Sequence, residues 1–548
     1  MSPSRRRPAA ITAVLVVLTL ALALPPVRGA APSAGPAPQR TAPGIPPGID
    51  ATVARIMQAF EVPGLALAIV KDGKVVLAKG YGVRKLGDPA PVDAKTLFGI
   101  ASNTKVFTAT ALGLLVEEGK LAWDARVVDY LPWFMMSDPY VTRELSVRDL
   151  LVHRSGLGLG AGDLLWWPES TYNREEIARR LRYIKLATSF RSAYAYDNVL
   201  YLVAGEVIQA LSGRTWEDFV GERILKKVGM TGSNVRHSAA AEGGNVATPH
   251  ARVEGVVRPI APFTSDNTNP AGGINSGAED MAKWMLVRLG RGKLADGTAL
   301  YSERTARQIE TPVTIVPNPA PPAELAPLRS NFSAYALGVG VRDYRGQRVL
   351  SHTGGLPGYV SIVTLLPERN LGIAVLTNAE STAAFSALTW QIVDHDLGAP
   401  ATDWAAAYLK LQARSEAETA KALGSSTAAR DAASKPSLAP AKYAGTYTDA
   451  WYGDIVIEET GGRLVMRFTR TPALVGEMEH WQYDTFVVRW RDRELRADAY
   501  VTFALRPDGS IERAKMEAVS PETDFSYDFQ DLDLRPSKPN GVGPQQIK

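Results

Sequence analysis

Strand-like segments lie at both ends of a long region of this chain, residues 49–411, and helix-like segments fill its centre. Near the start, apolar runs at residues 65–70 and 74–78 flank Lys71-Asp72-Gly73, and Asp-Gly between apolar runs is typical of a β-hairpin. Further strands are expected near the end of the region, at residues 336–341, 348–350, 359–366 and 372–376. Because a sheet must bury its apolar face, the simplest packing is one antiparallel sheet built from both ends.

Helical patterns account for most of the sequence between these strands. They cover residues 49–60 before the first strand and, further on, residues 102–118, 173–186, 199–211 and 278–289. The predicted fold class is therefore α+β, with an antiparallel sheet flanked by helices and an all-helical subdomain from the middle of the region.

The sequence changes character after residue 411, and a chain of 548 residues is too long for one ordinary domain. Residues 412–438 are rich in Ala, Ser, Glu and Lys before Pro436 and Pro440, and we interpret them as a helix that fades into a linker. Residues 439–537 then alternate apolar and polar side chains, with turn signals at Gly461-Gly462 and Asp508-Gly509. This alternation predicts a small all-β barrel.

The N-terminus has the pattern of a targeting segment. Three arginines at residues 5–7 precede an uncharged apolar run at residues 11–24, and small residues follow near position 29. We predict a signal peptide at residues 1–29, a flexible Ala/Pro/Gly-rich leader at residues 30–48, and a secreted or periplasmic protein with no stable membrane span after cleavage. Retention of the segment as an anchor is the alternative.

Net charge and residue usage exclude several classes of function. The formal net charge is +4, and residues 1–29 contain four arginines and no acid, so the mature chain is near neutral and no nucleic-acid partner is expected. The chain has no cysteine, and no two of its six histidines lie within five residues of each other. No thiolate chemistry, metal site or cofactor is therefore predicted.

Ser102 and Lys105 form an S-x-x-K pattern at the start of a predicted helix. Residues three apart lie on one face of a helix, so the amine is next to the hydroxyl. A buried amine with a lowered pKa can accept the hydroxyl proton. The alternative is an N-cap serine followed by a solvated lysine.

Two later segments contain groups that such a serine needs. Tyr196 and Asn198 are two residues apart in a non-helical segment, so both can face one cleft, and a phenol near a lysine ammonium is expected to have a lowered pKa. The segment Ser351-His352-Thr353-Gly354-Gly355 has paired glycines, which allow close approach of a substrate and leave N–H groups for an oxyanion. No serine lies in G-x-S-x-G, the nucleophile elbow of α/β-hydrolases.

In this order and at these intervals, the motifs resemble the serine β-lactamase and penicillin-binding-protein superfamily. Within it they resemble the class C-like branch, which includes D-aminopeptidases, D,D-carboxypeptidases and family VIII esterases. The segments at residues 98–102, 145–156 and 271–276 are also similar to that branch. The tail from Ala439 is similar to the lipocalin-like barrel appended to some of these hydrolases.

The resemblance implies a role for each matched residue. Ser102 would be the acylated nucleophile, Lys105 would activate it, and Tyr196 would act with Lys105 as the base and protonate the leaving group. The implied substrate-binding residues are Asn198, for the substrate amide, and His352, Thr353 and Gly354, on the edge strand of the cleft. The backbone N–H groups of Ser102 and Gly355 would form the oxyanion hole.

Other matched positions are expected to be structural. Ser155 lies in one such stretch. Ser276 with Glu279 has the spacing of a helix capping box.

One departure from the family pattern concerns His352. β-Lactamases of this branch usually have lysine there, a fixed charge for the substrate carboxylate, whereas histidine is mostly neutral at pH 7. The histidine form is similar to that of D-aminopeptidase-like peptidases.

The resemblance therefore implies a secreted serine hydrolase acting through an acyl-enzyme on an amide or ester of a small molecule or short peptide, foremost a D-aminopeptidase/carboxypeptidase-like peptidase.

The alternatives are a family VIII-type carboxylesterase, a class C-like β-lactamase, and a penicillin-binding-type sensor without turnover. The barrel is expected to shape the cleft or to serve in assembly. The sequence leaves the oligomeric state open.

Overall fold

The computed structural model describes residues 44–537, so the predicted signal peptide and most of the leader lie outside the described residues. A nine-stranded antiparallel sheet has the order β3-β2-β1-β13-β12-β11-β10-β9-β8. Its first strands are β1 (Gly64–Lys71), β2 (Lys74–Lys85) and β3 (Asp88–Pro91). The later strands are β8 (Thr314–Ile315), β9 (Ser333–Tyr335), β10 (Gly340–Tyr344), β11 (Gln347–Leu356), β12 (Tyr359–Leu366) and β13 (Leu371–Thr377).

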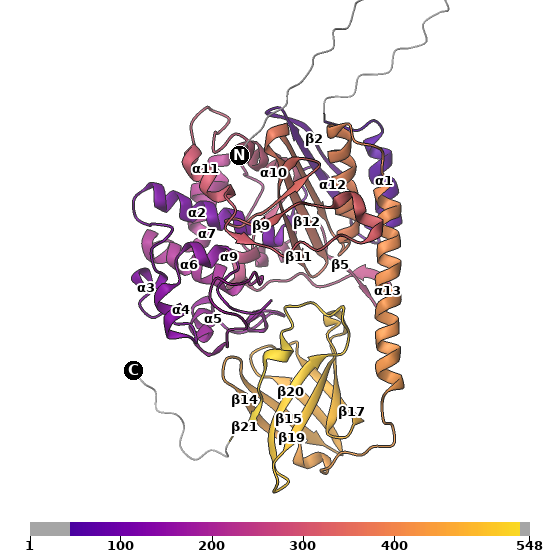
Figure 1. Cartoon of the computed structure of the whole chain (residues 1–548). Coiled ribbons are helices and arrows are strands. Elements are labelled where there is room, and N and C mark those ends of the chain that lie inside the picture. The colour runs from indigo at the N-terminus through magenta and orange to yellow at the C-terminus, as the bar shows by residue number, and fades with distance from the viewer. Residues whose placement is uncertain (1–43, 538–548) are drawn as a thin grey trace, which may run out of the picture. The chain divides into compact units, whose positions relative to one another are not determined.

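Strand β1 joins the two ends of the region, because it pairs with β2 on one side and with β13 on the other. The prediction of one sheet built from both ends is confirmed. Every residue of β1 is buried, since helices cover both faces of the sheet (Figure 1). Leu65, Leu67 and Ile69 belong to one apolar cluster, whereas Ala66, Ala68 and Val70 belong to another.

The two faces are covered by helices from different parts of the chain. The first cluster includes residues of α1 (Ile49–Ala59), α12 (Thr382–Leu397) and α13 (Trp404–Ala428). The second includes α10 (Ala278–Leu289) and α2 (Lys105–Glu117) and extends into the predicted helical subdomain. That subdomain contains α3 (Val127–Tyr130), α4 (Pro139–Glu144), α5 (Arg174–Arg180), α6 (Val199–Ser212), α7 (Trp216–Val220), α8 (Lys226–Val228) and α9 (Asn269–Gly272), and α11 (Glu303–Glu310) packs on α2.

Several predicted elements differ from the structure in extent. Helices α6 and α10 match their predicted ranges closely, but α5 ends at Arg180 and continues only as a 3-10 turn. Helix α13 begins at Trp404, earlier than predicted, because Asp403 accepts a hydrogen bond from Ala406 N–H (3.1 Å) and Trp404 is buried. The capping box predicted at Ser276 is wrong: Gly277 is the N-cap of α10, and Ser276 Oγ instead pairs with Ser233 Oγ at 2.8 Å.

The all-β unit predicted for the C-terminal part of the described chain is confirmed (Figure 1). It is an antiparallel sheet of eight strands. Its strands are β14 (Gly445–Asp449), β15 (Gly453–Thr460), β16 (Arg463–Phe468), β17 (Val475–Gln482), β18 (Thr485–Trp490), β19 (Ala499–Leu505), β20 (Ile511–Ala518) and β21 (Arg535–Pro536). A bridge between Ala514 and Leu534 brings β20 next to the segment before β21, which nearly closes the barrel.

The barrel and the helical subdomain share one continuous set of buried apolar residues. Polar contacts add to it: Arg180 donates to the carbonyl of Trp451 at 2.8 Å, and the Arg470 guanidinium lies 4.2 Å from the ring of Tyr172. These contacts fix the barrel against α5.

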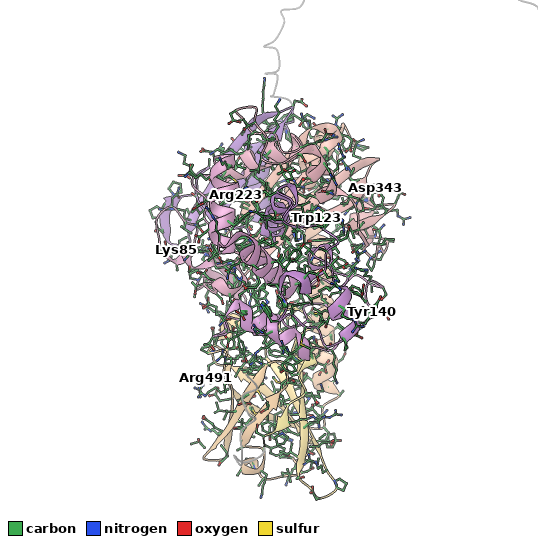
Figure 2. All side chains as sticks on the ribbon, turned by 90° about the vertical axis from the view of Figure 1, so that its left-hand side faces the viewer. Lys85, Trp123, Tyr140, Arg223, Asp343 and Arg491 are labelled. Atoms are coloured by element: carbon green, nitrogen blue, oxygen red, sulfur yellow. The ribbon has the colours of Figure 1, made fainter. Side chains whose placement is uncertain are left out.

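Ion pairs occur on the surface of both parts of the molecule. Arg223 pairs with Glu118 at 2.6 Å, and Arg491 pairs with Glu477 at 2.8 Å. Figure 2 labels the two arginines, one on each part of the molecule. Exposed pairs of this kind contribute little to stability, so the buried cores determine the fold. Within residues 44–537, no helix combines the length and apolar character needed to cross a membrane.

Candidate active site

Ser102 lies in a 3-10 turn, Ala101–Thr104, between β4 (Phe98–Gly99) and α2. The preceding Ala101 has φ 49°, a left-handed conformation that is strained for alanine. The turn is held by Ser361, whose Oγ donates to Ile100 O and accepts from Asn103 Nδ2, both at 2.8 Å. The serine is thus presented from a strained turn rather than from the first turn of the helix.

Lys105 is fully buried behind Ser102, with an exposed fraction of 0%. Its Nζ donates to Ser102 Oγ (2.9 Å), to Asn198 Oδ1 (2.7 Å) and to the Ala271 carbonyl (3.0 Å). Burial lowers the pKa of Lys105 to about 7, against the opposing effect of nearby carboxylates. The alternative of a solvated lysine is therefore wrong, and at pH 7 a large share of this amine is neutral and able to accept a proton.

Tyr196 contacts Ser102 from the other side, with its hydroxyl donating to Ser102 Oγ at 2.9 Å. Burial raises the pKa of Tyr196 well above its ordinary value. The predicted lowering was wrong because loss of hydration of a phenolate outweighs the attraction of one lysine that is itself only partly charged. In the resting site Tyr196 is a neutral phenol and a hydrogen-bond donor.

Asn198 links Lys105 to an acid that sequence reasoning missed, Asp163. The Asn198 oxygen accepts from Lys105, and its nitrogen donates to Asp163 Oδ2 at 2.8 Å. Trp166 Nε1 donates to Asp163 Oδ1 at 2.9 Å, and Ser526 Oγ donates to Oδ2 at 2.8 Å. Burial raises the pKa of Asp163 to about 7 despite these hydrogen bonds.

Strand β11 forms the opposite wall of the site. It pairs with β12 as far as Leu356 but with β10 only as far as Ser351. Within residues 44–537, no strand pairs with its other edge from His352 to Leu356. Thr353 and Gly355 are exposed on this edge. Gly354 faces the turn that holds Ser102, where a Cβ would come within 2.2 Å of Ile100 O. Its contact with a substrate stays a prediction.

His352 is neutral, as the sequence suggested. Its Nδ1 lies 2.5 Å from the carbonyl of Thr353, which can only accept, so Nδ1 carries the proton. Nε2 then accepts from the Tyr335 hydroxyl at 2.7 Å. Burial, helped by Lys105, lowers the pKa of His352 to about 3, so the imidazole provides no positive charge.

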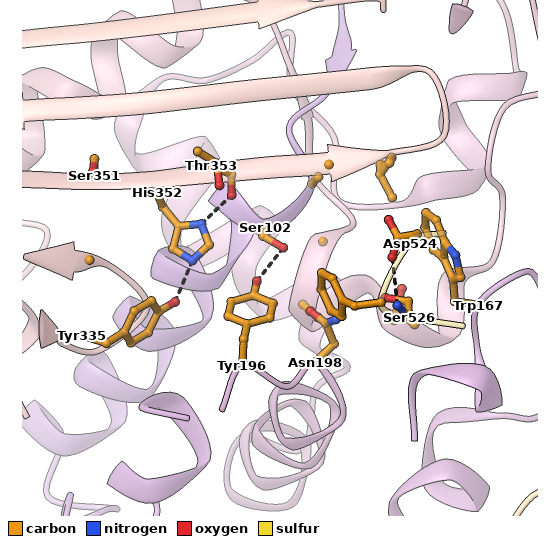
Figure 3. Close-up of a pocket in the computed structure, with 18 of the residues that line it drawn as sticks. Ser102, Trp167, Tyr196, Asn198, Tyr335, Ser351, His352, Thr353, Asp524 and Ser526 are labelled. Carbon is orange, nitrogen blue, oxygen red and sulfur yellow. Dashed lines mark hydrogen bonds between the residues drawn. The ribbon is translucent and has the colours of Figure 1, made fainter. Parts of the chain in front are cut away.

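These residues surround a cavity of about 450 Å³, a size suited to a small ligand. Figure 3 shows Ser102 and Tyr196 in the middle, His352 at one end, and Trp167 with Asp524 at the other. The predicted residues that line it are Ser102, Tyr196, Asn198, His352, Thr353 and Gly355. Among the described lining residues Asp524 is the one acid, and none is Lys or Arg.

The barrel contributes Asp524, Phe525 and Ser526 to the lining. The expectation that the barrel shapes the cleft agrees with this placement. No sequence signal identifies these three residues, because the loop that carries them follows β20, more than 400 positions after Ser102.

Comparison with known proteins gives two family matches. The Beta-lactamase family matches residues 49–397, and a domain of unknown function, DUF3471, matches residues 429–536. The unguisins hydrolase ungD of Aspergillus violaceofuscus is 27% identical over 519 residues, which cover 87% of this chain and 88% of that protein. Protein flp of Staphylococcus aureus is 24% identical over 357 residues, with 63% of this chain and 66% of the relative covered.

Solved structures share the fold at lower identity. The octameric penicillin-binding protein homologue from Pyrococcus abyssi has a TM-score of 0.57 and 21% identity, covering 89% of this chain and 98% of its own. A class C β-lactamase from Rhodobacter sphaeroides has a TM-score of 0.51 and 20% identity, covering 64% of this chain and 99% of its own. Because the Beta-lactamase family matches more than half of its length, the chain belongs to the β-lactamase family of the serine β-lactamase and penicillin-binding-protein superfamily.

Proposed function

We propose that the protein is a serine hydrolase that works through an acyl-enzyme at Ser102. One observation carries the proposal: Ser102 Oγ lies 2.9 Å from both Lys105 Nζ and Tyr196 Oη, between a partly neutral amine and a neutral phenol. A nucleophile within hydrogen-bond reach of a base that is itself oriented by a third group is the arrangement that covalent catalysis requires.

In the proposed reaction, neutral Lys105 takes the proton from Ser102 as Oγ bonds to the carbonyl carbon of an amide or ester. The oxyanion is held by the backbone N–H groups of Ser102 and Gly355. The Tyr196 phenol protonates the leaving group as the carbonyl–leaving-group bond breaks, and regains a proton from Lys105. Water then attacks the acyl-enzyme and transfers one proton to Lys105. Lys105 passes this proton to Ser102 Oγ as the bond between Oγ and the acyl carbon breaks, so that the acid leaves and Ser102 is again a hydroxyl beside a neutral amine.

The activity is expected to rise with pH, because the reacting form has deprotonated Lys105. The pKa of Lys105 is about 7, so kcat/KM should climb tenfold per pH unit below this value and level off above it. Initial rates from pH 5 to 9, with recovery at pH 8 after exposure to each pH as the control, measure the profile. A kcat/KM that is constant down to pH 5, or that falls as pH rises through 7, would contradict the assignment of Lys105 as base.

The charges of the residues that line the cavity favour substrates whose acyl group is neutral or positively charged. His352 is neutral and the described lining residues include no Lys or Arg, so a substrate carboxylate has no cationic partner there. Partial burial raises the pKa of Asp524, but the Ser526 N–H (2.9 Å) and the nearby Arg496 favour its carboxylate. Within the D-aminopeptidase/carboxypeptidase-like peptidases these charges favour the aminopeptidase, because a carboxypeptidase substrate carries a free carboxylate. We rank such a peptidase first, a carboxylesterase second and an efficient β-lactamase third.

Asp524 should favour substrates that carry an ammonium group. Replacing it with asparagine is expected to lower the ratio of kcat/KM for an aminoacyl anilide over its N-acetylated counterpart about 5- to 10-fold, the effect of a partly solvated charge-assisted hydrogen bond. The matched control is Asp508→Asn, in an exposed turn of the barrel. An unchanged ratio in Asp524→Asn would show that this carboxylate does not select substrates.

A parallel turnover panel tests the proposed function. It comprises a chromogenic cephalosporin, short-chain nitrophenyl esters, and D- and L-aminoacyl anilides, each with Ser102→Ala as the blank. Steady-state hydrolysis of anilides or esters that is absent from the blank supports the proposal. A stoichiometric burst without turnover would instead favour a sensor.

We also propose export of the protein, supported by the basic and apolar pattern at residues 1–29, and the domain boundaries 49–411, 412–438 and 439–537. N-terminal sequencing of the mature protein tests export: a start near residue 30 supports it, whereas an intact residue 1 contradicts cleavage.

A further inference from the structure

A loop of the barrel, residues 519–528 after β20, reaches the helical subdomain beside the candidate active site. Ser526 lines the cavity beside Asp524 (Figure 3). It is buried, and its hydroxyl donates to Asp163 Oδ2 at 2.8 Å. The two surfaces lie close together: at Gly160, which has φ +67°, a Cβ would come within 2.8 Å of Phe525. The loop therefore makes a fitted contact with the segment that carries Asp163.

Asp528 holds the same segment through its backbone. Its carboxyl oxygens accept from the N–H groups of Gly162 (2.7 Å) and Leu164 (3.0 Å), which flank Asp163 in sequence. Asp528 is completely buried, with an exposed fraction of 0%. Buried polar groups of this kind define one geometry, because losing either partner leaves an unsatisfied group.

A chain of hydrogen bonds connects Ser526 of the barrel loop to Ser102. Ser526 and Asn198 both donate to Asp163 Oδ2, Asn198 Oδ1 accepts from Lys105, and Lys105 contacts Ser102. The Asp163 carboxylate fixes the orientation of the Asn198 amide, since its nitrogen must face the acid and its oxygen must then face the lysine.

The charges around Lys105 make its proton sensitive to Asp163. Burial lowers the pKa of Lys105, while Asp163 and Asp197 raise it. The other groups facing it are His153, His352, Tyr196 and Tyr201. Hydrogen bonds from Asn198, Ser526 and Trp166 lower the pKa of Asp163 and so favour its carboxylate. The neighbouring carboxyl of Asp528 opposes this effect, because two carboxylates so close together repel each other.

We propose that the barrel is part of the catalytic apparatus, with Ser526 as a positioning residue that holds the Asp163 carboxylate against Asn198 and so keeps Lys105 aligned on Ser102. Asp528 anchors the segment in which Asp163 lies. This inference rests on the proposed hydrolase function and extends it, because it makes a domain outside the family match at residues 49–397 contribute to proton transfer at Ser102.

Ser526→Ala in the full-length chain tests the proposal by its pH profile. Loss of the hydroxyl shifts Asp163 toward its protonated form, and Lys105 then loses a charge that stabilises its ammonium. The acid limb, which is the part of the profile where kcat/KM rises with pH, should therefore move to lower pH by about half a unit. The plateau value of kcat/KM at high pH should fall about 10-fold, the effect of one hydrogen bond to a charged group.

Two controls separate positioning from stability. Ser526→Thr keeps the hydroxyl, so its acid limb should lie at the wild-type pH. Ser510 is an exposed serine in the turn before β20, so Ser510→Ala should leave both the acid limb and the plateau unchanged. A lower plateau with an unmoved acid limb in Ser526→Ala would mean a structural role only and would overturn the inference, as would a profile equal to that of Ser510→Ala. Since Ser102→Ala is measured in the same series, turnover that survives in that variant would mark failure of the proposed function itself.

Discussion

Replacing Ser102 with alanine is expected to reduce kcat/KM by about 10⁴-fold or more on every substrate of the wild-type protein, since removing a nucleophile leaves only binding and oxyanion stabilisation. Lys105 Nζ and Tyr196 Oη both hydrogen-bond to Ser102 Oγ, and among the described residues no other side-chain hydroxyl contacts both groups. Progress curves at high enzyme concentration measure the residual rate.

The matched control is Ser155→Ala. Ser155 is also buried, and its Oγ accepts from the Leu157 N–H at 3.2 Å, but it does not line the cavity. Its loss should change kcat/KM by no more than a few-fold. If Ser102→Ala keeps more than a tenth of the activity while Ser155→Ala is normal, the nucleophile lies elsewhere.

Replacing Lys105 with methionine should lower kcat about 10³-fold, within the range of a lost general base. Methionine has a similar length and fills the buried space, but Asn198 Oδ1 and the Ala271 carbonyl lose their donor. Thermal unfolding checks that the variant is folded at the assay temperature.

The variant Lys105→Arg shows whether Lys105 acts as a proton acceptor or only as a fixed positive charge. Arginine keeps the charge and donors but does not deprotonate in proteins, so it should be as inactive as Lys105→Met. Substantial activity in Lys105→Arg would show that positive charge alone suffices and that another group accepts the Ser102 proton.

The architecture could be predicted from the sequence because its signals are local. Asp72-Gly73 marks the first hairpin, and the apolar runs that become β1 and β13 are compatible with a fully buried pair of strands. Element limits were less predictable. The helix expected from Ser102 begins at Lys105, since the strained turn at Ala101 depends on Ser361 from the distant strand β12.

The environment of the site could not be predicted, because it depends on contacts across the whole chain. Asp163 has no motif, and its partners Asn198 and Ser526 lie 35 and 363 residues away. The raised pKa of Tyr196 follows from burial, which the order of residues does not express. The sequence therefore shows the residue types of the proposed catalytic groups, but it does not show the neighbouring groups that set their protonation.

The most direct test of the central claim is to locate the covalent adduct formed with a fluorophosphonate probe. Trypsin cleaves after Lys95 and Lys105, so Ser102 lies in one short peptide that also contains Thr96 and Thr104. Mass spectrometry of the labelled wild-type protein should show one probe per chain, on this peptide, with fragment ions placing it on Ser102. No adduct should form in Ser102→Ala. A full-stoichiometry adduct in Ser102→Ala, or an adduct on any other peptide of the wild-type protein, would contradict an acyl-enzyme at Ser102.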